Sequence, residues 1–322
     1  MLKTDEPQPQ DSDTARRLGT GILDRIGNTP LIRVEGPGWS HPGVAVLGKA
    51  EWANPGGSVK DRAAKSIVLD GIERGLIGRG NNRNLLDATS GNTGIAYAML
   101  GAVMGFPVTL VMPSNVSPER KQILAAYGVK IVWTDPADGT DGAICKAREI
   151  TSKHPEDYWY ADQYSNENNW RAHYQSTANE IWQQTEGRVT HFIAGLGTSG
   201  TFMGTTRRLK ELNSRIQCIS LEPDSPFNGL EGLKHMETAM VPQIYDAHLA
   251  DRKMQIETEE AYAMARRLAR ECGLMVGISA AAAVSASSQV ARECADRTEK
   301  AVIVTVLCDA ADKYLSERFW QE

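Results

Sequence analysis

The chain has 322 residues, of which 41% are hydrophobic and 23% are charged, and its formal net charge is −5 at pH 7. This length is enough for a sizeable core and two domains, and the acidic balance, without any basic run, argues against a nucleic-acid partner. No apolar stretch is long enough to cross a membrane, which argues against a membrane protein.

The start of the chain and its cysteines indicate the compartment. Residues 1–19 are mostly polar and include both acids and prolines, so we expect a flexible leader that is not a secretory signal. The five cysteines show no Cys-x-x-Cys spacing, which indicates free thiols and no redox or zinc site. Such thiols suit a reducing compartment, so we predict a cytoplasmic protein without a bound metal.

Apolar runs of strand length alternate with helical patterns through most of the chain. Such alternation predicts βαβ units, mostly parallel sheets flanked by helices, and ligands at the carboxyl ends of the strands. We expect a smaller, mobile N-terminal α/β domain over residues 48–157 and a larger one over residues 20–47 plus 158–322, with the active site between them. The predicted strands are 44–49, 84–87, 107–112, 129–134, 189–194, 217–221 and 301–307, and the later helices are 174–185, 199–212, 258–271 and 279–294.

The segment 54–62, Asn-Pro-Gly-Gly-Ser-Val-Lys-Asp-Arg, is predicted to be a loop that leads into a helix. Ser58 suits the N-cap, and the carboxylate of Asp61 could face the first helix amides. Lys60 would lie in the first turn, where the positive end of the helix dipole favours the neutral amine that Schiff-base chemistry needs. A single lysine is more often a solvated surface residue, so this hypothesis needs support from other segments.

A glycine-rich segment, 195–201, lies between a predicted strand and a predicted helix. Its backbone amides and hydroxyls could surround an anion at a helix N-terminus. The Gly-x-Gly-x-x-Gly spacing, with Glu222 after the next strand, is also typical of a dinucleotide site, and an ordinary βα turn is the third interpretation. The residues concerned are Gly195, Gly197, Thr198, Ser199, Gly200 and Thr201.

A second strand-to-helix turn, 89–94, is rich in donors and could bind a carboxylate, although a capped helix without a ligand has the same pattern. Ser279 opens an Ala-rich helix, where it could be a plain N-cap. Gln163 belongs to an Asp-Gln pair, which alone is a weak signal. His173 and His191 are expected to have packing or surface roles.

Taken together, these segments resemble the cysteine synthase (O-acetylserine sulfhydrylase) family, and most of all its cysteine synthase B branch. Residues 54–62 are similar to the lysine motif Asn-Pro-x-Gly-Ser-x-Lys-Asp-Arg of that family, apart from one extra glycine. Residues 26–31, 172–174, 180–185, 190–192 and 308–315 extend the resemblance from about residue 20 to the end. The chain departs from the pattern at Ala280, Ala281 and Ala311, where the family usually has Ser, Thr or Gly.

The resemblance implies an α/β, two-domain, tryptophan synthase β-like fold (fold type II) and the cofactor pyridoxal 5'-phosphate (PLP). It implies that Lys60 holds PLP and acts as the base, with a serine hydroxyl at the pyridine nitrogen that makes PLP a weaker electron sink. The cofactor-binding residues would be Lys60, Asn92, Gly195, Gly197, Thr198, Ser199, Gly200, Thr201 and Ser279. The substrate-binding residues would be Thr89, Ser90, Gly91, Asn92, Thr93, Gln163 and Lys234.

The implied reaction is a β-replacement in which O-acetyl-L-serine loses acetate, through an α-aminoacrylate intermediate, and sulfide adds to give L-cysteine. A rival hypothesis uses O-phosphoserine with a thiocarboxylate or thiosulfate donor, because the loop around Lys234 resembles that of such relatives; a surface lysine is the plainer interpretation. Cystathionine β-synthase, a serine or threonine dehydratase and a non-catalytic binding relative are less favoured. The expected partners are small substrates, a second copy in a homodimer, and serine acetyltransferase or a sulfur-carrier protein.

Overall fold

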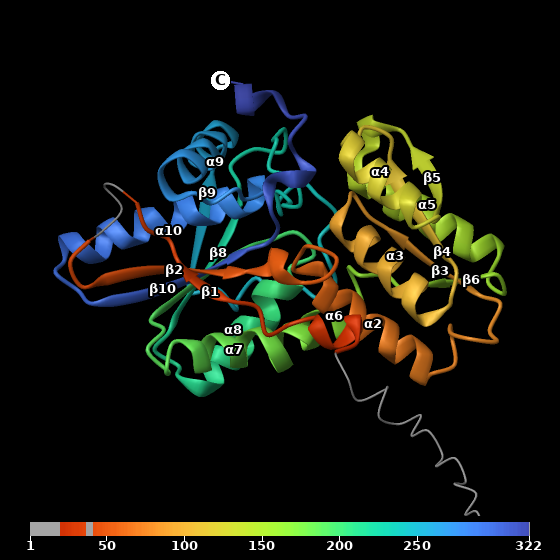
Figure 1. Ribbon diagram of the computed structural model, residues 1–322, viewed down its shortest axis with the longest axis horizontal. Helices are drawn as coiled ribbons and strands as arrows, with labels where there is room; N and C mark the ends of the chain where they lie inside the picture. The colour runs from red at the N-terminus through yellow and green to blue at the C-terminus, as the bar shows by residue number, and fades with distance from the viewer. Residues whose placement is uncertain (1–19, 37–40, 322) are drawn as a thin grey trace, which may run out of the picture.

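Two β-sheets organise the chain, and each forms one lobe of the molecule (Figure 1). The computed structural model describes residues 20–36 and 41–321. In the larger sheet only β1 is antiparallel, and all pairs of the smaller sheet are parallel. The larger sheet has the order β1 (Leu31–Arg33), β2 (Val44–Ala50), β10 (Ala301–Leu307), β7 (His191–Gly195), β8 (Gln217–Pro223) and β9 (Arg252–Ile256), and the smaller one has the order β5 (Lys130–Thr134), β4 (Val108–Pro113), β3 (Asn84–Ala88) and β6 (Tyr158–Tyr160).

The central strands of the larger sheet are buried on both faces, which explains their continuous apolar sequences. In β10, Ile303 and Leu307 belong to one core, and Val304 and Val306 belong to the opposite one. The first core lies under α9 (Thr258–Cys272) and α10 (Ile278–Asp296). The second lies under α7 (Ala178–Gln184) and α8 (Gly200–Leu212), so helices cover both faces of this sheet (Figure 1).

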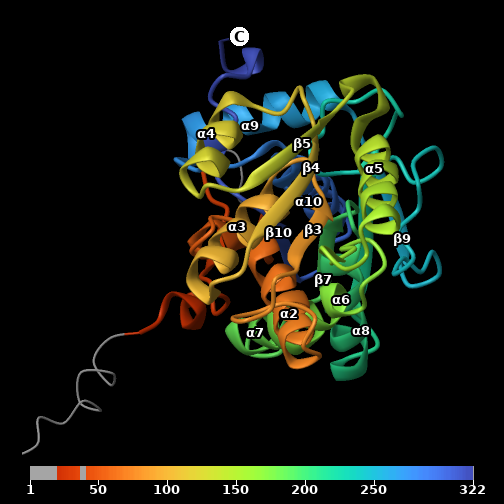
Figure 2. The ribbon, with the colours of Figure 1, turned by 90° about the vertical axis from the view of Figure 1, so that its right-hand side faces the viewer.

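The smaller sheet follows the same rule, as the view onto its lobe shows (Figure 2). Leu85 and Leu110 pack in one core, while Leu86 and Val111 pack in another on the opposite face. The helices of the first core are α2 (Lys60–Glu73), α3 (Asn92–Met104) and α4 (Pro118–Ala126), and α5 (Gly139–Lys153) covers the second. The prediction of an α/β protein with mostly parallel sheets is therefore confirmed.

Every strand predicted from an apolar run is present within two residues of its expected bounds. The strands β1, β6 and β9 were not predicted, because edge strands of three to five residues carry little hydrophobic signal. Also not predicted were α5 and the short α6 (Asn168–Ala172), which continues through a π-helical turn, His173–Thr177, into α7.

The expected domain division stays a prediction, but the strand pairing bears on its boundaries. Residues 48–50 pair within the larger sheet, and residues 158–160 pair within the smaller one, so the sheets divide the chain slightly differently from residues 48–157. The leader expected at residues 1–19 lies outside the described residues.

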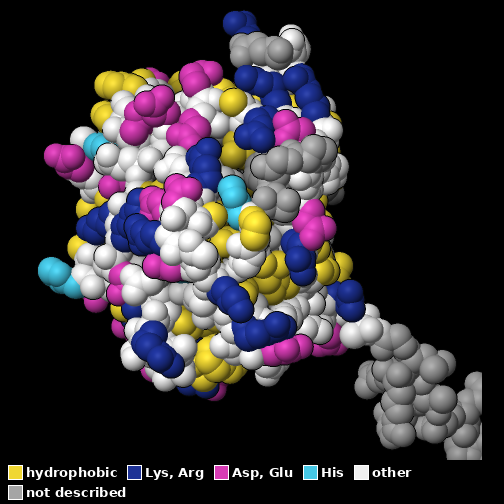
Figure 3. Space-filling view, turned by 90° about the vertical axis from the view of Figure 1, so that its left-hand side faces the viewer, with side chains coloured by type: hydrophobic (Ala, Val, Ile, Leu, Met, Phe, Trp, Pro, Cys, Tyr) yellow, Lys and Arg dark blue, Asp and Glu magenta, His cyan; other side chains and the backbone are white. Residues whose placement is uncertain are grey.

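The surface and the helices add two observations on partners. Within the described ranges, no helix is long and apolar enough to cross a membrane. On the face shown in Figure 3, acidic and basic side chains are interspersed, so that face presents no large field of one sign.

Candidate active site

A pocket between the two sheets brings together every predicted site residue except Gly200. It encloses about 930 Å³, its open mouth included. Three of its walls are segments that follow β3, β7 and β10, as expected where parallel strands end. The predicted residues that line it are Lys60, Thr89, Ser90, Gly91, Asn92, Thr93, Gln163, Gly195, Gly197, Thr198, Ser199, Thr201, Lys234 and Ser279.

The loop before Lys60 is held from both sides, and α2 begins at Lys60 itself. The amide of Asn54 donates to the carbonyl of Ser58 at 3.1 Å and accepts from Gly27 N at 2.8 Å. Gly57 has a φ of +76°, a conformation that favours glycine, and its carbonyl accepts a 2.7 Å hydrogen bond from Lys313 Nζ. The loop therefore presents Lys60 to the pocket from a fixed backbone.

The expected cap of this helix differs in detail. Ser58 Oγ accepts from Lys60 N at 3.2 Å, but the residue before the helix is Val59. The carboxylate of Asp61 turns away from the helix and accepts from Gly56 N at 2.5 Å, because the absent side chain of Gly56 leaves room for it. Burial raises the pKa of Asp61 to about 7.

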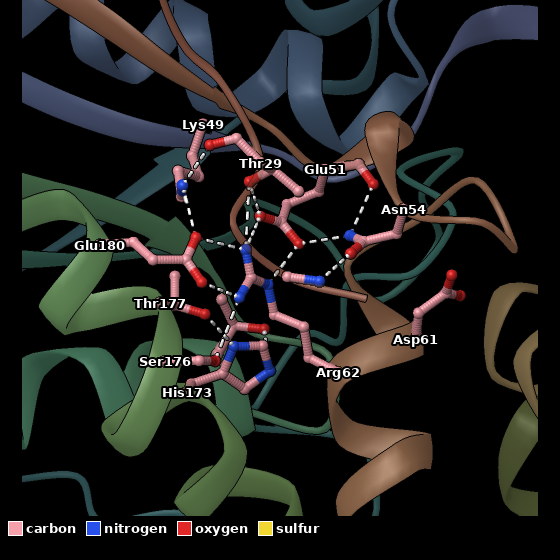
Figure 4. A network of polar contacts seen from close by, with 12 residues as sticks. Thr29, Lys49, Glu51, Asn54, Asp61, Arg62, His173, Ser176, Thr177 and Glu180 are labelled. Atoms are coloured by element: carbon pink, nitrogen blue, oxygen red, sulfur yellow. Dashed lines mark hydrogen bonds and ion pairs between the residues drawn. The ribbon is translucent and has the colours of Figure 1, made fainter. Parts of the chain in front are cut away.

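An ion-pair network anchors α2 behind Lys60 (Figure 4). The guanidinium of Arg62 forms ion pairs with Glu51 at 2.8 Å and with Glu180 at 2.6 Å. Lys49 Nζ, which is fully buried, reaches Glu180 at 2.6 Å. Hydrogen bonds from these two cations hold the pKa of Glu180 at about 2, against the opposing effect of its burial. The network thus ties α2 to β2 and α7 through charges that depend on one another.

The glycine-rich loop is shaped by close contacts with its neighbours. A Cβ on Gly197 would lie 2.1 Å from the carbonyl oxygen of Gly232, and one on Gly200 would lie 2.0 Å from Asn169 Oδ1. The left-handed backbone falls on Ser199, with φ +69°, and not on a glycine. The hydroxyl of Ser199 is buried and has no hydrogen-bond partner among the described residues. A buried donor without a partner fits an anion that the loop would bind.

The 89–93 turn is linked to the glycine-rich loop through buried amides. Thr93 Oγ1 donates to Gln163 Oε1 at 2.7 Å, and Gln163 Nε2 donates to the carbonyl of Ala88 at 2.7 Å. Asn169 Nδ2 then donates to the carbonyl of Gln163 and to Thr198 Oγ1, at 2.7 and 3.0 Å. Since both ends of its amide are engaged, Gln163 is placed to orient Thr93, and its contact with substrate stays a prediction.

Asn92 is held by a buried carboxylate that the sequence did not single out. Its Nδ2 donates to Asp309 Oδ2 at 2.7 Å, and the hydroxyl of Tyr314 donates to the same oxygen at 2.8 Å. Asn92 Oδ1 is buried and unpaired among residues 20–36 and 41–321. Asp309 therefore fixes which atoms of the Asn92 amide remain available to a ligand.

Ser279 lines the pocket, but it is not the helix cap that was one of its interpretations. Gly277 precedes α10, and Ser279 is the second helical residue. Beside it lies Cys308, and burial raises the pKa of this thiol to about 11, so it stays protonated at neutral pH. Ala280 and Ala281 are fully buried, so the larger core accommodates both departures from the family pattern.

His173 has the packing role that was expected. Burial lowers its pKa well below the ordinary value, so the ring is neutral. It lies 2.9 Å from Thr177 Oγ1 and 3.3 Å from Thr201 Oγ1, and it thereby supports the glycine-rich loop from behind.

Comparison with known proteins decides the family. The family model for pyridoxal-phosphate dependent enzymes matches residues 22–309. The cysteine synthase of Aquifex aeolicus is 52% identical over 95% of this chain and 94% of its own length, and cysteine synthase B of Pseudomonas aeruginosa is 42% identical over 92% and 95%. The chain belongs to the cysteine synthase family.

The solved structures agree with this assignment. The crystal structure of cysteine synthase from Entamoeba histolytica matches with a TM-score of 0.87 at 33% identity, and the match covers 100% of this chain and 95% of that one. The predicted fold type II and the predicted cofactor are thereby confirmed, and the chain is a PLP enzyme of the cysteine synthase family.

The pocket of this cysteine synthase family member fits PLP by its own chemistry. The unpaired hydroxyl of Ser199 and the unpaired amide oxygen of Asn92 point to polar groups that the protein does not supply. Lys60 Nζ makes no hydrogen bond or ion pair with any described residue, so it is free to bind a ligand. We therefore expect the 195–201 loop to hold the phosphate, with Asn92 and Ser279 at the ring.

Several pocket residues were not predicted from sequence. They come from segments that are far apart in the chain. Tyr164, Ala194 and Leu233 each lie next to a predicted residue, and Cys308 at the end of β10 could have been found from the rule that ligands bind at strand ends. The residues missed are Arg120, Thr140, Tyr164, Ala194, Glu231, Gly232, Leu233, Val306, Cys308 and Tyr314.

Proposed function

We propose that this enzyme makes L-cysteine from O-acetyl-L-serine and sulfide and releases acetate. The observation that carries the proposal is the convergence of Lys60, the 89–93 turn and the 195–201 loop on one pocket. These segments provide an amine, a carboxylate site and a phosphate site, which are the groups that a PLP-dependent β-replacement needs. The cysteine synthases that the chain resembles support the same reaction.

The residues have separable tasks in this proposal. The amides and hydroxyls of the 89–93 turn bind the α-carboxylate of the amino acid, at the N-terminus of α3. Lys60 Nζ would take the proton from the α-carbon, and acetate would leave the β-carbon with the electron pair of its bond. Sulfide would then add to the β-carbon, and Lys60 would return the proton to the α-carbon to give L-cysteine. Bound PLP supplies the electron-withdrawing group that makes the α-proton acidic. Ser279, which lines the same pocket, would offer the pyridine nitrogen a neutral hydroxyl, which does not hold a ring nitrogen protonated as a carboxylate would.

A second candidate is the use of O-phosphoserine, because Arg120 and Lys234 both line the pocket. A dianionic phosphate would need at least one free cation. Both side chains are, however, already in ion pairs, Arg120 with Glu231 and Lys234 with Asp141. This arrangement favours the uncharged acetyl ester.

The test is an absorbance titration of the purified holoenzyme with each amino acid, combined with a colorimetric assay for L-cysteine. We expect O-acetyl-L-serine to shift the cofactor band and sulfide to restore it, with L-cysteine formed in proportion. A shift with O-phospho-L-serine alone would transfer the assignment to the second candidate. A preparation that binds no PLP would contradict the proposed reaction altogether.

We also propose that the enzyme is a cytoplasmic homodimer, by analogy with enzymes of this fold. Serine acetyltransferase or a sulfur-carrier protein are the proposed protein partners. Light scattering of the purified protein, alone and with each partner, tests these assignments.

A further inference from the structure

Two cations in the pocket wall are each bound by a carboxylate from the opposite side of the pocket. Arg120 belongs to α4, on the smaller sheet, and its partner Glu231 lies in the loop between β8 and β9. Lys234 lies in that same loop, and its partner Asp141 belongs to α5 on the smaller sheet. Both ion pairs therefore join the two lobes, but the cation belongs to the smaller lobe in one pair and to the larger lobe in the other.

Arg120 is buried against the 89–93 turn, the proposed site of the substrate carboxylate. Only 3% of the residue is exposed, and its guanidinium lies 4.7 Å from the ring centre of Tyr314. A Cβ on Gly91 would lie 2.6 Å from Arg120 Nε, so the guanidinium packs directly on the 89–93 turn. Nη1 binds Glu231, whereas Nε is buried and unpaired among the described residues. The buried Nε is thus a donor without an acceptor beside the proposed carboxylate site.

Lys234 also has a carboxylate partner. Its Nζ donates to Asp141 Oδ1 and to the carbonyl of Met240, the latter at 3.3 Å, and it lies 5.1 Å from the ring centre of Tyr164. Asp141 Oδ2 accepts from Met240 N at 2.7 Å, so both carboxylate oxygens are engaged. Each carboxylate, Asp141 and Glu231, has 35% of its side chain exposed, while the two cations are almost buried.

The loop that carries Glu231 and Lys234 is held against the glycine-rich loop. Lys234 N donates to the carbonyl of Leu196 at 2.8 Å, and the carbonyl of Gly232 lies against Gly197. The glycine-rich loop therefore fixes the positions of Glu231 and Lys234. The charge that a ligand meets therefore depends on whether the Arg120–Glu231 and Lys234–Asp141 ion pairs are intact, and not on a change of loop conformation.

We propose that Glu231 and Asp141 are specificity-determining residues that set the charge of the β-substituent the pocket accepts. By compensating Arg120 and Lys234, they leave the pocket suited to an uncharged ester and unsuited to a phosphate monoester. A cation without its partner would attract a dianion strongly in a partly desolvated pocket. This inference rests on the proposed use of O-acetyl-L-serine.

The experiment removes each carboxylate charge and keeps its cation. The variants are E231Q and D141N, the double variant R120Q/E231Q, and the control E149Q. The control removes an α5 carboxylate that pairs with the surface lysines Lys146 and Lys153. Holoenzymes saturated with PLP are titrated with inorganic phosphate at constant ionic strength, and the cofactor absorbance or inhibition of turnover reports binding. Circular dichroism checks that each variant is folded.

We expect the dissociation constant of phosphate to fall by about tenfold in E231Q and in D141N, and to remain unchanged in E149Q. The gain should vanish in R120Q/E231Q, and the ratio of kcat/KM for O-phospho-L-serine over O-acetyl-L-serine should rise in both single variants. Unchanged phosphate affinity in the two folded single variants, or a gain that persists in the double variant, overturns the inference. If the wild-type enzyme does not use O-acetyl-L-serine, the proposed function fails on its own, and the phosphate titration still reports on the ion pairs.

Discussion

Replacing Glu180 by glutamine tests the charge network behind Lys60. Glu180 is the shared acceptor of Lys49 and Arg62, with ion-pair distances of 2.6 Å to each, and it also accepts from Asn28 N at 2.9 Å. Glutamine keeps the shape and one oxygen but removes the negative charge. The fully buried ammonium of Lys49 then loses its only carboxylate contact among the described residues.

The magnitude follows from the pKa of Glu180, which is about 2 in the folded protein against 4.5 for a free side chain. A shift of that size corresponds to about 3 kcal/mol, which partial solvation of the carboxylate reduces. Breaking a buried pair by removing one partner costs about 3 to 5 kcal/mol in other proteins. We therefore expect E180Q to lower the free energy of unfolding by about 2 to 4 kcal/mol, or the melting temperature by about 3 to 6 °C.

The pH dependence gives an independent check. Because the folded pKa lies below the unfolded one, the stabilisation is complete above pH 4.5 and is lost as the pH falls toward 2. The gap between wild type and E180Q should be full at pH 7 and should narrow below pH 4.5. Calorimetry or urea unfolding measures it, with E211Q as the control, since Glu211 pairs with Arg208 on the surface. If E180Q is as stable as E211Q at pH 7, the network does not stabilise the fold.

Three further predictions concern single sites. Burial raises the pKa of Asp61 to about 7, so this carboxyl lowers the stability of the fold as the pH rises from about 4 to 7. The melting temperature of D61N minus that of wild type should therefore be larger at pH 8 than at pH 5. Gly197→Ala should weaken PLP binding by an order of magnitude or more, measured by equilibrium dialysis, because the added Cβ meets the carbonyl of Gly232; unchanged binding would refute the close approach. Cys145 is exposed, whereas Cys272 and Cys308 are half-buried and Cys218 and Cys294 are buried, so C145S should remove the fastest phase of thiol titration with Ellman's reagent.

Much of the site followed from sequence because its parts are local. A strand of apolar residues that ends in glycines and hydroxyls marks the carboxyl edge of a parallel sheet, and Thr89 and Gly195 were found in this way. The position of Lys60 in the first turn of α2 followed from Pro55 and the glycines before it. These signals lie within a few residues of the side chains that they place.

The remaining features depend on partners that are distant in sequence. Arg120 and Glu231 are 111 residues apart, and Asn92 and Asp309 are 217 residues apart, so no local pattern indicates either contact. The orientation of Asp61 was mispredicted for a different reason. A carboxylate near a helix start can bind helix amides or a preceding loop amide, and the space beside Gly56 decides between them only in three dimensions.

The position of β10 in the larger sheet has a consequence for how the chain folds during translation. This strand is the last in the chain, yet it lies between β2 and β7 in the middle of the larger sheet. The strands of the smaller sheet all lie between residues 84 and 160, so that lobe can assemble while the ribosome is still translating the rest. The larger sheet cannot close until residue 307 has emerged. We therefore expect a ribosome-bound chain that ends before β10 to protect the smaller lobe from protease while it leaves β2 and the glycine-rich loop exposed.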